Sequence, residues 1–72
     1  MEKVIQIEGM SCQHCVGHVE AALGQVAGVR KVRVDLSQKK ATVELDGTVP
    51  DEKLKAAVED MGYDVIAIRE ND

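Results

Sequence analysis

The fold is decided by the stretch VRVDLSQKKATVEL, residues 32–45, in which two alternating segments flank a short polar link. Every second residue on either side of the link is apolar: Val32, Val34, Leu36, Ala41, Val43 and Leu45. Successive side chains of a strand point to opposite faces, so this period of two predicts strands with one buried face. Because residues 37–40 form a short polar connection, residues 32–45 are predicted to form an antiparallel hairpin.

N-terminal to the hairpin, the pattern predicts one strand and one helix. Residues 3–8 alternate, with Ile5 and Ile7 on one side, and the Gly-Met-Ser segment that follows interrupts the alternation. Ser11 is the expected N-cap of the helix, and Gly28 is expected to end it. Between them, apolar residues recur at helical spacing: Val16, Val19, Ala22, Leu23 and Val26.

C-terminal to the hairpin, a second helix and a fourth strand are expected. Pro50 and the two acidic residues behind it suit a helix N-terminus, and Gly62 suits its end. Residues 63–69 predict the last strand, and residues 70–72 are expected to form a frayed tail. The buried stripe of the second helix is expected to comprise Leu54, Ala57, Val58 and Met61.

The resulting order of elements, β-α-β-β-α-β, predicts an α+β fold of the ferredoxin-like type. In such a fold a four-stranded antiparallel sheet carries both helices on one face, and the core lies between the sheet and the helices. This arrangement explains why each strand alternates and why each helix has a single apolar stripe. A chain of 72 residues has room for one such domain, which we expect over residues 1–69.

Composition excludes several classes of function. The net charge is −4 and no basic face is evident, so nucleic acid is not an expected partner. The N-terminus lacks the apolar run of a signal peptide, and no segment approaches the roughly 20 apolar residues that cross a bilayer. We therefore expect a cytoplasmic protein without direct membrane insertion. In a reducing cytosol, two neighbouring cysteines favour metal binding or redox chemistry over a structural disulfide.

The only two cysteines, Cys12 and Cys15, stand three positions apart where the first strand gives way to the first helix. Both thiols are expected to converge near the helix N-terminus, whose unpaired N–H groups and positive dipole end favour thiolates. Two thiolates suit a soft cation such as Cu(I), whereas structural zinc normally takes four ligands. A dithiol oxidoreductase is the alternative from another class, although the chain is short for a thioredoxin-like fold.

Residues 9–15, GMSCQHC, resemble the metal-binding loop of the heavy-metal-associated (HMA) domain. The segments Gly28-Val29 and Gly62-Tyr63-Asp64 resemble two further landmarks of that family. The chain is most similar to bacterial cytosolic copper chaperones of the CopZ type. The resemblance implies a carrier of Cu(I) rather than an enzyme. Its implied partners are the N-terminal metal-binding domain of a copper-transporting P-type ATPase and a copper-responsive repressor.

Four residues are expected to surround the metal: Met10, Ser11, His14 and Tyr63. By resemblance, Met10 is buried under the loop and Tyr63 packs near the metal, where its hydroxyl is expected to limit water and tune charge. For His14, metal ligation, tuning of thiol acidity and plain solvent exposure are all compatible with the sequence. His18 lies four residues further on and is expected to be exposed.

The resemblance makes Cys12 and Cys15 the metal ligands. Mercury and silver suit two thiolates as well as Cu(I) does. Zinc, cadmium and lead versions of the family tend to carry an acidic residue near the cysteines, where this chain has Ser11. We expect a monomer without metal and a copper-bridged dimer at higher loading.

Overall fold

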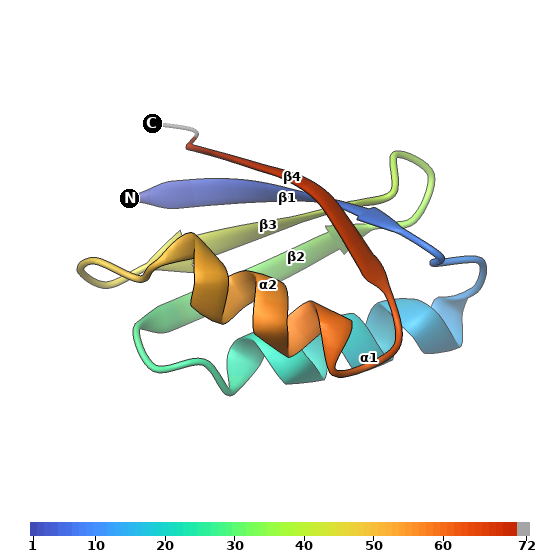
Figure 1. The fold of residues 1–72 in the computed structure, drawn as a ribbon, viewed down its shortest axis with the longest axis horizontal. Coiled ribbons are helices and arrows are strands. Elements are labelled where there is room, and N and C mark those ends of the chain that lie inside the picture. Colours follow the sequence, from blue (N-terminus) through green and yellow to red (C-terminus); the bar gives the residue numbers. More distant parts are fainter. Residues whose placement is uncertain (71–72) are drawn as a thin grey trace.

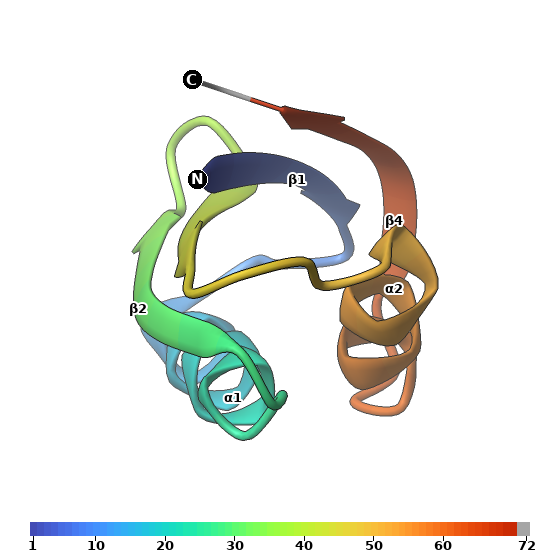
Figure 2. The ribbon, with the colours of Figure 1, turned by 90° about the vertical axis from the view of Figure 1, so that its left-hand side faces the viewer.

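Figure 1 shows the computed structural model of the protein, which describes residues 1–70. The four strands of this part of the chain form one antiparallel sheet in the order β2-β3-β1-β4, and both helices cover the same face of it (Figure 2). The predicted ferredoxin-like fold is confirmed. The elements are β1 (Glu2–Glu8), α1 (Gln13–Gly24), β2 (Val29–Asp35), β3 (Lys40–Leu45), α2 (Asp51–Glu59) and β4 (Asp64–Glu70).

The hydrophobic core lies between the sheet and the helices and is aliphatic. α1 buries Val19 and Leu23, which stand four residues apart and so lie on one face of the helix. Met61, which was predicted to lie in this core, is 41% exposed. That prediction was wrong because α2 ends before Met61, so the helical stripe does not continue to it. The largest fully buried side chains are Ile5, Ile7, Leu23, Leu54, Val19, Val43 and Val58.

Both helices end earlier than the glycines in the sequence indicated. α1 ends at Gly24, and a run of backbone-bonded turns leads from there to β2. Gly28 has a φ of +94°, a left-handed conformation that favours glycine, and it lies in this turn rather than at the helix end. α2 likewise ends at Glu59, and Gly62 adopts the same φ of +94° before β4 begins.

The last strand extends one residue further than predicted. Glu70 pairs with Lys3 of β1, so Glu70 belongs to β4 and not to a frayed tail. Asn71 and Asp72, the rest of the predicted tail, lie outside the described residues. Neither helix within residues 1–70 has the length and apolar character that a membrane crossing requires.

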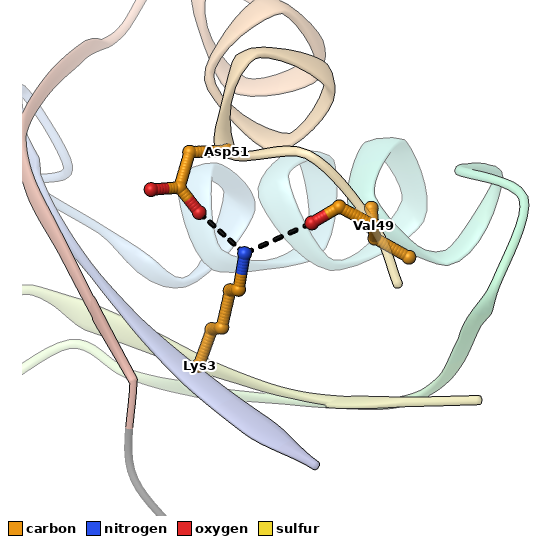
Figure 3. A network of polar contacts seen from close by, with 3 residues as sticks. All are labelled: Lys3, Val49 and Asp51. Atoms are coloured by element: carbon orange, nitrogen blue, oxygen red, sulfur yellow. Dashed lines mark hydrogen bonds and ion pairs between the residues drawn. The ribbon is translucent and has the colours of Figure 1, made fainter. Parts of the chain in front are cut away.

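Lys3 connects β1 to the start of α2 (Figure 3). No sequence pattern indicated this contact. Lys3 is only 8% exposed, and its Nζ donates to the carbonyl oxygen of Val49 at 2.9 Å and pairs with the carboxylate of Asp51 at 2.5 Å. Asp51 is the first residue of α2, where the helix dipole favours negative charge. A buried ammonium is costly unless it is paired, so these two bonds let a lysine occupy a buried position of β1.

Candidate metal-binding site

The two cysteines lie together where β1 passes into α1. Their Sγ atoms are 3.7 Å apart, and both are free thiols, since the sulfurs of a disulfide are only about 2 Å apart. Cys12 is exposed and Cys15 is partly buried. The pair is therefore open to another molecule through Cys12.

The loop of residues 9–12 brings the thiols together. Met10 is 3% exposed and belongs to the hydrophobic core, so it anchors the loop to the body of the domain. Cys12 is the N-cap residue of α1, and its carbonyl oxygen accepts bonds from the N–H groups of Cys15 (3.1 Å) and Val16 (3.3 Å). Ser11 was predicted as the N-cap and is not, because the helical bonds begin one residue later. Cys15 consequently lies in the first turn of the helix, close to its unpaired amide groups.

Hydrogen bonds lower the pKa of Cys15 from 9.0 to about 6. The largest cause is the bond from the backbone N–H of Ser11, and the second is the bond from the hydroxyl of Tyr63. Hydrogen bonds with Cys12 act in the same direction, and partial burial opposes them. Each of these donors stabilises the thiolate more than the thiol. At neutral pH Cys15 is therefore largely a thiolate, the form that binds metal.

Tyr63 lies in the turn before β4 and packs against the core. The bond that its hydroxyl donates to Cys15 raises the pKa of Tyr63, because loss of the phenolic proton would break the bond. Burial and the negative charge at the two cysteines act in the same direction. Tyr63 thus acts as a donor to the sulfur of Cys15.

A model of the heavy-metal-associated domain matches residues 4–64. The chain belongs to this family. Copper chaperone CopZ of Staphylococcus haemolyticus (strain JCSC1435) is 47% identical over 66 residues, which cover 90% of this chain and 97% of the relative. A solved CopZ metallochaperone superposes with a TM-score of 0.86 at 39% identity, covering 92% of this chain and 100% of that one. A copper binding domain from HMA7, a P-type ATPase, superposes with a TM-score of 0.83 at 39% identity, covering 94% and 97%.

Among the residues that the structure describes, the two thiols have no third His, Cys, Asp or Glu side chain grouped with them. Within residues 1–70, no three His, Cys, Asp or Glu side chains are grouped closely enough to hold a metal ion. His14 and His18 lie on α1 and are exposed. The described chain therefore offers Cys12 and Cys15 as a two-sulfur site.

One contributor to the site was missed by sequence reasoning, and the role of another was not anticipated. Ser11 was predicted to lie near the metal, but it acts through its backbone N–H, which every residue except proline supplies, so its residue type did not indicate this role. Gly9 has a φ of +104° and lies against the ring of Tyr63. The sequence marked Gly9 as an interruption of the first strand and as the first residue of the loop of residues 9–15. It did not indicate the contact with Tyr63, because that contact joins residues that are far apart along the chain.

Proposed function

We propose that the protein is a carrier of Cu(I), which holds the ion between Cys12 and Cys15 and passes it on by exchange of thiolate ligands. The observation that carries this proposal is the pair of free thiols, 3.7 Å apart, at an exposed position of a heavy-metal-associated domain. Identity of 47% to a copper chaperone supports copper as the cargo. The activity is binding and release, and no catalytic turnover is assigned to the site.

Two sulfur ligands suit Cu(I) better than they suit zinc. Thiolates select the soft Cu(I) ion, whereas structural zinc completes a tetrahedron of four ligands. A linear arrangement needs sulfurs separated by roughly twice a metal–thiolate bond of about 2.3 Å, so the 3.7 Å pair opens when it binds such an ion. Cys12 makes this movement, because Cys15 is held by Ser11 and Tyr63.

Transfer begins when a thiolate of the partner approaches the copper from the side of Cys12. The incoming sulfur becomes a third ligand, Cys12 leaves before Cys15, and copper remains Cu(I) because ligands are exchanged and no electron moves. A metal-binding domain at the N-terminus of a copper-transporting P-type ATPase is the partner that we propose. The similarity of this chain to a solved copper binding domain of a P-type ATPase supports that choice. A copper-responsive repressor is the second proposed recipient.

The proposal also covers the location and assembly of the carrier. We place it in the cytoplasm, where reducing conditions keep both thiols free. Residues 1–70, including Glu70 at the end of β4, act as one metal-binding domain. The protein is a monomer without metal, and at higher loading two copies share copper through their exposed thiols. Analytical ultracentrifugation at increasing Cu(I) tests this, since a dimer that forms equally without copper would contradict it.

Anaerobic titration with Cu(I) against a chromophoric Cu(I) chelator tests the binding step. We expect one ion per monomer at low loading and no competitive binding after the double change Cys12→Ser, Cys15→Ser. His14→Gln is a matched control, because it alters an exposed side chain between the two cysteines and should leave the stoichiometry unchanged. Undiminished binding by the double variant would contradict the proposal.

The order of exchange is tested by transfer to the partner's soluble metal-binding domain. Cys12→Ser should slow transfer more than Cys15→Ser, because the exposed residue meets the incoming thiolate first. Equal slowing by the two changes would contradict the proposed order of exchange, but it would not contradict copper binding by the two cysteines.

Competition separates the alternative cargoes and the alternative class. If mercury or silver displaced Cu(I) at equimolar concentration, the cargo would be another soft metal. If the protein bound zinc in preference to Cu(I), the cargo would be a borderline metal. An insulin-disulfide reduction assay tests the dithiol oxidoreductase. We expect no turnover above that of a simple dithiol.

A further inference from the structure

Gly9 and Tyr63 face each other just beyond the end of the β1–β4 ladder. The last pair of that ladder is Glu8 with Asp64, and Gly9 directly follows β1 while Tyr63 directly precedes β4. A Cβ atom at Gly9 would lie 3.4 Å from Cδ1 of Tyr63 and 3.9 Å from its Cα. A methyl group at Gly9 would therefore touch the ring of Tyr63, and a larger side chain directed toward the ring would collide with it.

The same ring carries the hydroxyl that bonds to Cys15. Gly9 is also required by the backbone, since its φ of +104° is strained for any residue with a side chain. Gly9 thus meets two independent requirements: it adopts the positive φ of the turn that follows β1, and it leaves space for the ring of Tyr63. Only the second requirement concerns the metal site.

We propose that Gly9 is a positioning residue for the metal site: the free space beside its backbone seats the Tyr63 ring so that the hydroxyl reaches and orients Cys15. An aromatic ring laid across a glycine on a neighbouring strand fills the gap that the missing side chain leaves. Residues that orient a metal ligand commonly contribute about tenfold or more to metal affinity. The inference rests on the proposed function, in which Cys15 is a copper ligand.

The variants Gly9→Ala and Gly9→Val test the inference, with Gly47→Ala and Gly47→Val as matched controls. Gly47 has nearly the same backbone conformation, with a φ of +100°, but a Cβ atom there meets no atom within 4 Å. The controls therefore report backbone strain without contact with the ring. At Gly9, alanine would just touch the ring of Tyr63, whereas we expect the two additional methyl groups of valine to displace the ring.

The first measurement uses the metal-free protein and does not depend on copper. Tyr63 is the only tyrosine, and the chain has no Phe or Trp, so its ring protons are readily assigned by NMR. We expect a nuclear Overhauser contact between this ring and the β-protons of Cys15 in the parent and both Gly47 variants. The contact should persist in Gly9→Ala, whose Cβ would lie at van der Waals distance from the ring, and disappear in Gly9→Val. An undiminished contact in Gly9→Val, or in Gly9→Leu if the valine variant does not fold, would overturn the inference.

The second measurement is a cycle of Cu(I) affinities, with and without the change Tyr63→Phe. Relative to Gly47→Val, Gly9→Val should weaken binding about tenfold when the hydroxyl is present and about twofold or less when it is absent. Gly9→Ala should bind Cu(I) as tightly as Gly47→Ala does, because its Cβ reaches only van der Waals contact with the ring. Equal losses in both backgrounds would overturn the inference. Failure of the parent protein to bind Cu(I) would instead reject the proposed function, and the NMR test of Gly9 would still apply.

Discussion

Removal of one hydroxyl group, by Tyr63→Phe, tests how the site activates the thiol of Cys15. The hydroxyl of Tyr63 stabilises the Cys15 thiolate, so the pKa of Cys15 should rise from about 6 when this donor is lost. The backbone N–H of Ser11, the larger cause, remains in place. The new pKa should therefore lie below the ordinary value of 9.0, and we expect an increase of about 1 unit.

The magnitude of the effect on reactivity follows from the fraction of thiolate. With a pKa of about 6, about half of Cys15 is ionised at pH 6 and about nine tenths at pH 7. A rise of about 1 unit leaves about one tenth at pH 6 and half at pH 7. Alkylation of Cys15 should therefore slow about fivefold at pH 6 and about twofold at pH 7, and should converge with the parent rate above pH 9.

The assay is timed alkylation with iodoacetamide from pH 5 to pH 10, with tandem mass spectrometry to assign the label to Cys15 rather than Cys12. His14→Gln is the control, because His14 is exposed and is not among the groups that lower the pKa of Cys15. An unchanged midpoint in Tyr63→Phe would refute the role of the hydroxyl. A parent midpoint near 9.0 would refute the whole account of how this thiol is activated.

Three further predictions concern stability, each measured by urea unfolding of the metal-free protein. Gly28→Ala should cost more than Gly62→Ala, by about 1–3 kcal/mol. Both glycines have a φ of +94°, but only at Gly28 would a Cβ meet the buried Val49, at 2.6 Å from its Cγ2; equal costs would contradict this. Lys39→Gly should stabilise by about 0.5 kcal/mol, because Lys39 has a φ of 55° that glycine adopts without strain, and any destabilisation would be the opposite result. Leu23→Ala should cost about 3 kcal/mol because Leu23 is fully buried, and a cost below about 1 kcal/mol would show that the site is not tightly packed.

The order and type of the elements could be predicted from sequence, because burial on one face imposes a regular spacing of apolar residues on each strand and helix. The hairpin of residues 32–45 alternates strictly, and its pairing brings Val34 opposite Ala41 as the pattern requires. Helix ends were less readable. Gly28 and Gly62 adopt the left-handed conformation in turns that lie several residues beyond each helix. Sequence alone does not distinguish such a position from a helix C-cap. Met61 was misplaced for the same reason.

The candidate site was only partly readable. The spacing of Cys12 and Cys15 at a strand-to-helix junction predicted two converging thiols, since that junction has few possible geometries. The hydroxyl of Tyr63 was expected near the metal from the resemblance, but the largest donor to Cys15, the backbone N–H of Ser11, could not be predicted from residue type. Lys3 was equally unpredictable: a charged residue in an alternating strand is normally solvated, and its burial depends on Val49 and Asp51 arriving from another part of the chain.

The most direct test of the central claim is X-ray absorption at the copper edge, on protein loaded with one equivalent of copper under reducing, anaerobic conditions. The two free thiols, with no third ligand grouped beside them in residues 1–70, predict an edge characteristic of Cu(I) and a first coordination shell of two sulfur atoms from Cys12 and Cys15. A shell containing imidazole nitrogen, or the same spectrum after Cys12→Ser and Cys15→Ser together, would contradict the account.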